Sequence, residues 1–135
     1  MNNPSREEIK EVLDTAKTIA VVGLSPNPNR TSYMVSEAMQ KAGYRIIPVN
    51  PAADEVLGEK SYASLSDIPE PVDIVNVFRR SEFLAELADE FLKVGSPVFW
   101  TQLNVVDENV FKKLSNAGYT VIMDRCIKVE HAILK

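Results

Sequence analysis

Short apolar runs alternate along this chain with longer segments in which apolar residues recur every three or four positions. The short runs are typical of buried strands, and the longer periodicity is typical of amphipathic helices. The predicted strands cover residues 18–22, 45–49, 73–78, 97–101 and 120–123. The predicted helices cover residues 33–42, 81–94 and 107–117, and an N-terminal helix begins at the capping box formed by Ser5 and Glu8.

Strands that alternate with helices predict an α/β fold with a parallel sheet. We expect a single doubly wound Rossmann-like domain over residues 1–135, with a five-stranded parallel sheet and helices on both faces. Numbered along the chain, the strands are expected in the order 3-2-1-4-5, with the topological switch between the first and the fourth. Ligands of such sheets bind beyond the carboxyl ends of the strands, so the residues that follow each strand hold the candidate site.

Gly23 differs from the other glycines because it ends a predicted strand and opens a polar loop. Gly43, Gly95 and Gly118 each follow a predicted helix and precede a strand, which is the place of a helix C-cap. At Gly23, the missing side chain allows a ligand or the next helix to approach closely. Ser25 stands where the dinucleotide fingerprint G-x-G-x-x-G has its second glycine, so the loop is not a standard dinucleotide site.

Composition limits the kinds of partner and site that this chain is expected to have. The chain has 135 residues, 45% of them hydrophobic, and a formal charge of -4 with no run of basic residues, so neither nucleic acid nor a membrane surface is expected to bind it. One cysteine excludes an internal disulfide, and one cysteine with one histidine excludes a Cys/His metal cluster. Without a signal-peptide pattern or an apolar run of about 18 residues, we expect a cytoplasmic protein.

Four arginines follow or flank the carboxyl ends of the predicted strands, namely Arg30, Arg79, Arg80 and Arg125. An acidic protein can therefore still present a cationic mouth to phosphate groups at this edge of the sheet. The alternative is that arginines in loops are solvated surface residues.

Hydroxyl side chains surround the start of the second predicted helix. Ser25, Thr31 and Ser32 can donate to a diphosphate, next to the free backbone amides and the positive end of the helix dipole. Arg30 can add a bidentate, charge-assisted contact. The same hydroxyls can instead cap the helix, and Tyr33 can belong to the core because it begins an apolar helical face.

Asn50 follows the second strand, where a site for NAD usually has an acidic residue that binds the ribose diol. A ligand with an extra phosphate on its ribose tolerates asparagine better than an acid, and Pro51 fixes the backbone just beyond it. With the third strand beside the second, Arg79 is expected to reach that ribose.

Together these motifs resemble those of small CoA-binding proteins, Rossmann-like domains similar to the nucleotide-binding domain of the succinyl-CoA synthetase alpha subunit. The residues that carry the resemblance are 22–25, 30–33, 43–51, 77–81 and 123–131. The resemblance implies a coenzyme A site without catalytic machinery of its own. The cofactor-binding residues it implies are Gly23, Leu24, Ser25, Arg30, Thr31, Ser32, Tyr33, Asn50, Pro51, Phe78, Arg79 and Gln102. The chain departs from the family at Asn104, where such domains often carry glycine.

Three classes of function remain open at this stage. The first is binding of CoA or a short acyl-CoA without chemical change. The second is an enzyme, either a nicotinamide-dependent oxidoreductase or a fragment of a CoA ligase or transferase, although no paired acid and base are evident. The third is a regulatory subunit with a vestigial nucleotide site that binds another protein.

Cys126 and His131 do not form a nucleophile and base pair on one helical face, because a spacing of five residues turns their side chains about 140° apart. Cys126 is then either a small buried hydrophobic residue or, since it follows the fifth strand, a partner for the thiol of CoA in a mixed disulfide. No metal site is expected.

Overall fold

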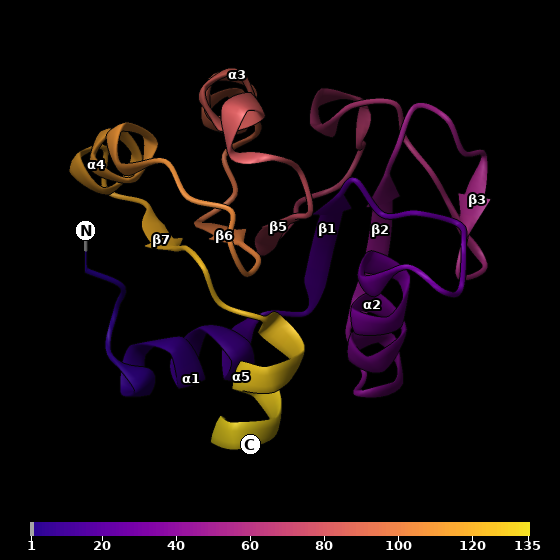
Figure 1. Cartoon of the computed structure of the whole chain (residues 1–135), viewed down its shortest axis with the longest axis horizontal. Coiled ribbons are helices and arrows are strands. Elements are labelled where there is room, and N and C mark those ends of the chain that lie inside the picture. The colour runs from indigo at the N-terminus through magenta and orange to yellow at the C-terminus, as the bar shows by residue number, and fades with distance from the viewer. Residues whose placement is uncertain (1) are drawn as a thin grey trace.

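The computed structural model describes residues 2–135, which form a parallel sheet of five strands in the order β2-β1-β5-β6-β7 (Figure 1). The strands are β1 (Thr18–Val22), β2 (Arg45–Val49), β5 (Ile74–Val77), β6 (Val98–Thr101) and β7 (Thr120–Ile122). Each lies inside, or coincides with, a strand predicted from the apolar runs. The predicted α/β class, the five parallel strands and the helices on both faces are confirmed.

Helices cover the sheet in two layers (Figure 1). One layer contains α1 (Arg6–Thr15), α2 (Thr31–Lys41) and α5 (Ile127–Leu134), and the other contains α3 (Leu84–Val94) and α4 (Glu108–Asn116). Each layer encloses its own hydrophobic core. Leu13 and Met39 pack with Trp100 on the first face, whereas Phe91 and Leu114 pack on the second. Strands buried on both faces explain why their sequences are apolar runs without alternation.

The expected strand order 3-2-1-4-5 is wrong, because the third predicted strand, β5, lies next to β1 on the side away from β2. The cause is the face on which residues 50–73 cross the sheet. Leu65 and Val72 of this connection are buried in the core of α3 and α4, opposite α2. Right-handed crossovers on opposite faces travel in opposite directions, so the chain returns past β1 after β2. The topological switch therefore lies between β1 and β5.

The same connection contains structure that the apolar pattern did not predict. A short antiparallel hairpin joins β3 (Glu55–Val56) to β4 (Glu59–Lys60), and a 3-10 turn forms at η1 (Leu65–Asp67). Later in the chain, the helix predicted over residues 81–94 begins with the 3-10 turn η2 (Ser81–Phe83) and continues as α3. Beyond the hairpin, Tyr62 pairs with the outer edge of β2, its N–H donating to the Pro48 carbonyl at 3.0 Å. At the opposite edge, the Asn3 side chain makes two hydrogen bonds with the Met123 backbone, of 2.8 and 2.9 Å.

Polar side chains cap the N-termini of α1 and α4, and glycines follow the C-termini of α2, α3 and α4. Ser5 Oγ accepts a hydrogen bond from the Glu8 N–H at 3.2 Å at the start of α1, and Asp107 Oδ1 accepts from the Val110 N–H at 3.1 Å at the start of α4. Gly43, Gly95 and Gly118 follow helices with positive φ angles, as predicted for C-caps.

Candidate ligand-binding site

A cavity of about 260 Å³ opens at the carboxyl edge of the sheet. Its wall combines the first residue of α2, the residues after β5 and β6, and the residue that precedes α5. The lining residues are Thr31, Phe78, Gln102, Leu103, Val105 and Cys126. Three of these, Thr31, Phe78 and Gln102, are among the predicted site residues. The cavity lies in the region that the carboxyl-edge rule selects, next to the switch between β1 and β5.

The loop after β1 is held close to the end of β5 at Gly23. Gly23 has a φ of +86°, and a Cβ atom there would overlap the carbonyl oxygen of Phe78 and lie 3.2 Å from its carbonyl carbon. Only glycine fits this contact, so its first role is to allow the two loops at the switch point to pack together. A ligand at this edge would meet backbone from both loops.

Hydroxyl groups then fix the loop onto α2. Ser32 Oγ accepts from the Ser25 N–H at 3.0 Å, and Ser25 Oγ accepts from the Asn27 N–H at 3.1 Å. A hydroxyl that accepts in this way can still donate its proton. The capping and ligand-binding interpretations of these serines are therefore compatible.

The start of α2 offers backbone donors. The Met34 N–H donates to the Arg30 carbonyl at 3.1 Å, whereas among residues 2–135 the amides of Thr31, Ser32 and Tyr33 have no hydrogen-bond acceptor. Free amides at a helix N-terminus favour an anion. The exposed side chain of Arg30 stands at the N-cap and makes no hydrogen bond or ion pair within the described chain. Tyr33 is half-buried and packs against the core beneath α2.

Asn50 has a structural task that the sequence did not indicate. Its Nδ2 donates to the Leu24 carbonyl at 3.0 Å and its Oδ1 accepts from the Ala52 N–H at 2.9 Å, which joins the loops after β1 and β2. Leu24 is fully buried, and its carbonyl is already bonded to the Asn50 amide. Pro51 is exposed beside them.

Arg79 lies beside the β1 loop and not beside β2, because β1 separates β5 from β2. The expectation that Arg79 reaches a ribose held at Asn50 from an adjacent strand is therefore wrong. Its Cδ lies 3.4 Å from the place of a Cβ on Gly23, and its guanidinium lies 4.7 Å from the centre of the Phe83 ring. The ring holds a positive charge near the loop that follows β1.

Residues 102–106 form a rigid wall. Thr101 Oγ1 donates to the Val105 carbonyl at 2.6 Å, and the Val106 N–H donates to Ser81 Oγ at 2.8 Å. Asn104 has a φ of +68° and its N–H donates to Asp124 Oδ1 at 2.7 Å. Asparagine tolerates this left-handed conformation, which explains how it replaces the family's glycine.

Leu103, Val105 and Cys126 were not among the predicted site residues. Leu103 is 59% exposed although it is large and apolar. An isolated leucine between polar residues in a loop at a strand end was the available signal for this wall.

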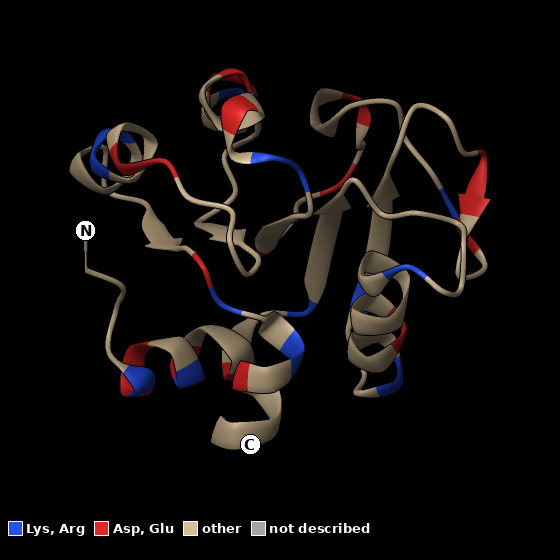
Figure 2. Cartoon of the chain, in the orientation of Figure 1, with Lys and Arg blue, Asp and Glu red and all other residues tan. Residues whose placement is uncertain are grey.

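Basic residues mark the carboxyl edge. Blue segments precede α2 and α3 and follow β7 in Figure 2, where Arg30, Arg79, Arg80 and Arg125 occur, all of them exposed. Arg80 contacts the carboxylate of Glu82 at 3.6 Å. Within residues 2–135, Arg79 makes no ion pair, so its charge, like that of Arg30, is available to an anion.

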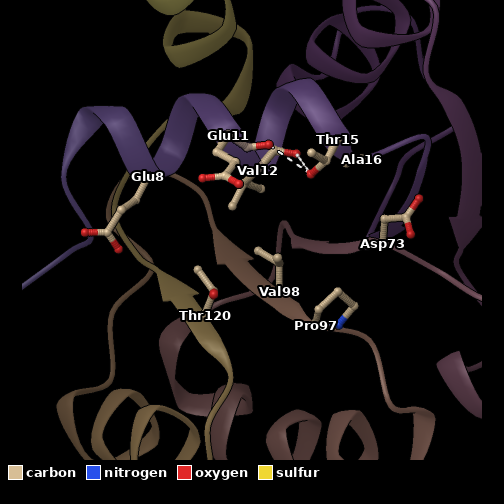
Figure 3. A pocket seen from close by; sticks show the side chains of 9 residues that line it. All are labelled: Glu8, Glu11, Val12, Thr15, Ala16, Asp73, Pro97, Val98 and Thr120. Carbon is tan, nitrogen blue, oxygen red and sulfur yellow. Dashed lines mark hydrogen bonds between the residues drawn. The ribbon is translucent and has the colours of Figure 1, made fainter.

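A second cavity, of about 360 Å³, lies at the opposite edge of the sheet between α1 and the amino ends of β6 and β7. Figure 3 shows the carboxylates of Glu8, Glu11 and Asp73 around an apolar floor that includes Val98. Asp73 Oδ2 already accepts from the N–H groups of Lys17 and Thr18. Carboxylates repel phosphate groups, so this larger cavity does not suit an anionic ligand.

The strongest titration shift also belongs to the amino edge. Hydrogen bonds from Lys10 and Lys135 lower the pKa of Asp14 to about 2. Burial raises the pKa of Tyr44, whose hydroxyl donates to the Leu13 carbonyl and whose ring contacts His131 edge to face. These contacts join α1, α5 and the segment between α2 and β2, and they involve no residue of the carboxyl-edge cavity.

His131 and Cys126 line different cavities, in agreement with the predicted lack of a Cys-His pair. No group of three His, Cys, Asp or Glu side chains in the described part of the chain is arranged to hold a metal ion. Over the same residues, no helix is both long and apolar enough to traverse a lipid bilayer.

Comparison with known proteins identifies the family to which the chain belongs. The family model of the CoA-binding domain matches residues 17–132, which include every element from β1 into α5. The chain belongs to the CoA-binding domain family. The resemblance inferred from the loop motifs is thus confirmed at the level of the family.

Several relatives share this domain. The uncharacterized protein YneT of Bacillus subtilis is 60% identical over 135 residues, all of both chains. A solved structure, cell-free ID.343 of Thermus thermophilus, has a TM-score of 0.94 and 38% identity, covering 98% of this chain and 100% of that one. An ADP-forming acetate–CoA ligase of Archaeoglobus fulgidus is 31% identical over 81 residues, which are 58% of this chain and 12% of the ligase. The chain is therefore homologous to a small part of a much longer enzyme.

Proposed function

We propose that this protein binds coenzyme A, or a short acyl-CoA, at the carboxyl edge of its sheet and does not transform it. Membership of the CoA-binding domain family supports the ligand. The observation that carries the proposal is the cavity between Thr31 and Gln102, which begins at the unpaired amides of α2 and continues between apolar walls. The unpaired amides of α2 suit the diphosphate of CoA, and the space between the apolar walls suits its pantetheine arm.

In this proposal, each predicted site residue has a defined part. The amides of Thr31, Ser32 and Tyr33, together with the hydroxyl of Ser25 and the guanidinium of Arg30, bind the diphosphate. Gly23 contributes backbone, and the buried Leu24 holds the loop in place through its hydrogen bond with Asn50. Asn50 and Pro51 shape the turn beside the ribose. Arg79 adds positive charge, and Phe78 and Gln102 contact the pantetheine arm.

Binding without turnover is supported by the chemistry of the edge. Among residues 2–135, the cavity wall contains one thiol and no histidine or carboxylate that could act as its base. We therefore expect thioesterase, ligase and reductase assays of the isolated protein to give no turnover. Reproducible turnover that Cys126→Ser abolishes would contradict this part of the proposal.

The direct test is calorimetric titration of the apoprotein, under reducing conditions, with CoA, acetyl-CoA, NADH, NADPH and ATP. Mass spectrometry of the purified protein beforehand checks for a ligand that copurifies. CoA or acetyl-CoA is expected to bind most tightly, because asparagine and not an acid directly follows β2 at the position that binds the ribose diol of NADH. Tighter binding of NADH than of CoA would favour an oxidoreductase, and no binding of any nucleotide would favour a regulatory subunit with a vestigial site.

A further inference from the structure

Cys126 is the free thiol of the chain and forms part of the wall of the carboxyl-edge cavity. It is half-buried at the N-cap of α5, directly after the turn that follows β7. Thr31, at the amide end of α2, lines the same cavity. A ligand whose phosphates lie at α2 and whose arm enters the cavity would thus bring its far end toward the thiol.

Gln102 independently indicates that the cavity holds a polar ligand. Its side chain is 5% exposed and its Nε2 donates to Asn76 Oδ1 at 2.7 Å. No donor within residues 2–135 reaches its Oε1, and this oxygen is not among the buried atoms that lack a partner, so an accessible, unpaired amide acceptor belongs to a residue that lines the cavity. An acceptor of this kind can bind a ligand that supplies an N–H group.

The rest of the wall fits the same ligand. Phe78, Leu103 and Val105 are apolar and line the same cavity as Gln102. The arm of CoA has this pattern, because amide N–H groups alternate with short apolar segments and a thiol ends the arm. This step rests on the proposed function, since the nucleotide must bind first.

We propose that Cys126 is a redox-sensitive attachment site at which the protein takes up CoA covalently from CoA disulfide. The Cys126 thiolate attacks one sulfur of the disulfide, the S–S bond of the reagent breaks, and a new S–S bond joins Cys126 Sγ to one CoA. The other CoA leaves as a thiolate and accepts the proton that Cys126 lost. Cys126 is oxidised, one CoA is reduced to its thiol, and an added thiol reverses the exchange.

Bound nucleotide should accelerate this exchange because it turns an encounter in solution into a reaction within the complex. Glutathione disulfide has the same reactive bond but no nucleotide to hold at α2. The ratio of the two exchange rates therefore distinguishes a cysteine beside a nucleotide-binding site from a cysteine that is only accessible to solvent.

The experiment follows the reduced, desalted full chain by intact-mass spectrometry during incubation with CoA disulfide or glutathione disulfide. We expect one CoA per chain, attached at Cys126, and a rate at least ~10-fold above that with glutathione disulfide. Excess desulfo-CoA, which lacks the thiol, should slow the CoA disulfide reaction to the glutathione rate.

The matched control is the double variant Cys126→Ser with Ser115→Cys, which moves the thiol to an exposed position on α4. Thiol exchange of this variant should show no preference for CoA disulfide over glutathione disulfide. The ratio measured for the variant also corrects for the different charges of the two reagents. Serine is a favourable N-cap, so the change at position 126 should leave α5 intact.

Calorimetry of Cys126→Ser with CoA under reducing conditions distinguishes the two proposals. If CoA binds but the wild-type rate ratio equals that of the control variant, the attachment site is wrong and the proposed function stands. If CoA does not bind and the ratio is also that of the control, both proposals are wrong.

Discussion

The two edges of the sheet have opposite chemistry. At the carboxyl edge, a cavity of about 260 Å³ includes Thr31 in its wall, and the unpaired amides, the hydroxyls and the unpartnered Arg30 lie beside this residue in the chain. At the amino edge, a larger cavity of about 360 Å³ is rimmed by Glu8, Glu11 and Asp73 (Figure 3). The size of a cavity is therefore a poor guide to its function in this molecule. The charge and the unpaired donors at its rim decide which ligand it can bind.

The two edges also differ in whether their charged side chains have partners within the protein. Asp14 at the amino edge is held by Lys10 and Lys135. At the other edge, Arg30 and the first amides of α2 have no partner within the described chain. We infer that the amino edge contributes to the stability of the fold, and that the carboxyl edge carries the ligand. Four predictions test this difference.

Gly23→Ala should have the largest effect. The new Cβ overlaps the Phe78 carbonyl oxygen in a left-handed backbone, so we expect at least ~2 kcal/mol of destabilisation. The loop after β1 must also move, which should abolish detectable CoA binding. Thermal unfolding and calorimetry measure the two effects.

Gly118→Ala is the control for Gly23→Ala. Gly118 also has a positive φ, of +96°, but a Cβ there meets nothing within 4 Å. Only the backbone strain remains, at about 1 kcal/mol, and CoA affinity should be unchanged. Equal effects of the two changes would show that the close approach at Gly23 is unimportant.

Arg30→Ala should weaken CoA binding by about 10- to 150-fold, equivalent to ~1.5–3 kcal/mol for a charged hydrogen bond. Its melting temperature should not change, because the side chain has no partner in the described structure. Arg6→Ala on α1, an exposed arginine of the amino-edge helix, should leave the affinity unaltered. An unchanged Kd for Arg30→Ala would show that this arginine is a solvated surface residue that does not bind CoA.

Arg79→Ala should weaken binding of CoA and of dephospho-CoA by the same factor, about 3- to 10-fold. The equality follows from the position of Arg79 beside Gly23, where a diphosphate would lie, and not beside Asn50. Titration of both ligands into wild type, Arg79→Ala and the neighbouring control Arg80→Ala gives the factors. A loss confined to CoA would place the 3′-phosphate at Arg79.

Asp14→Asn should have the smallest effect and only on stability. The folded-state pKa of about 2 lies below the ordinary 3.8, so the charged form stabilises the fold above pH 3.8 and this contribution is lost as the pH falls toward 2. The difference in melting temperature between wild type and Asp14→Asn should shrink over that range. CoA affinity at neutral pH should be the same for both, and a weaker affinity would contradict the separation of the edges.

The sequence predicted the strands, the caps and half of the cavity wall because those features depend on local patterns. Apolar runs identified all five strands, and Thr31, Phe78 and Gln102 follow from the carboxyl-edge rule. It did not predict the order of the strands. Residues 50–73 contain no amphipathic helix to show which face they cross, although that face decides the direction of a right-handed connection.

The sequence also did not predict which groups the side chains contact. Asn50 reads as a residue for the ribose until its two hydrogen bonds to backbone are seen. Cys126 and Leu103 come to the cavity from loops after different strands, and nothing in the spacing of such loops reports how they fold.

At each edge of the sheet, the carboxyl end of the outer strand is partnered by the chain itself. Tyr62 pairs with β2, and the Asn3 amide pairs with the backbone just beyond β7 as a further residue of strand would. An open strand edge is a template on which other chains can assemble and aggregate. These two pairings therefore shorten the length of open edge on which a second chain could add a strand.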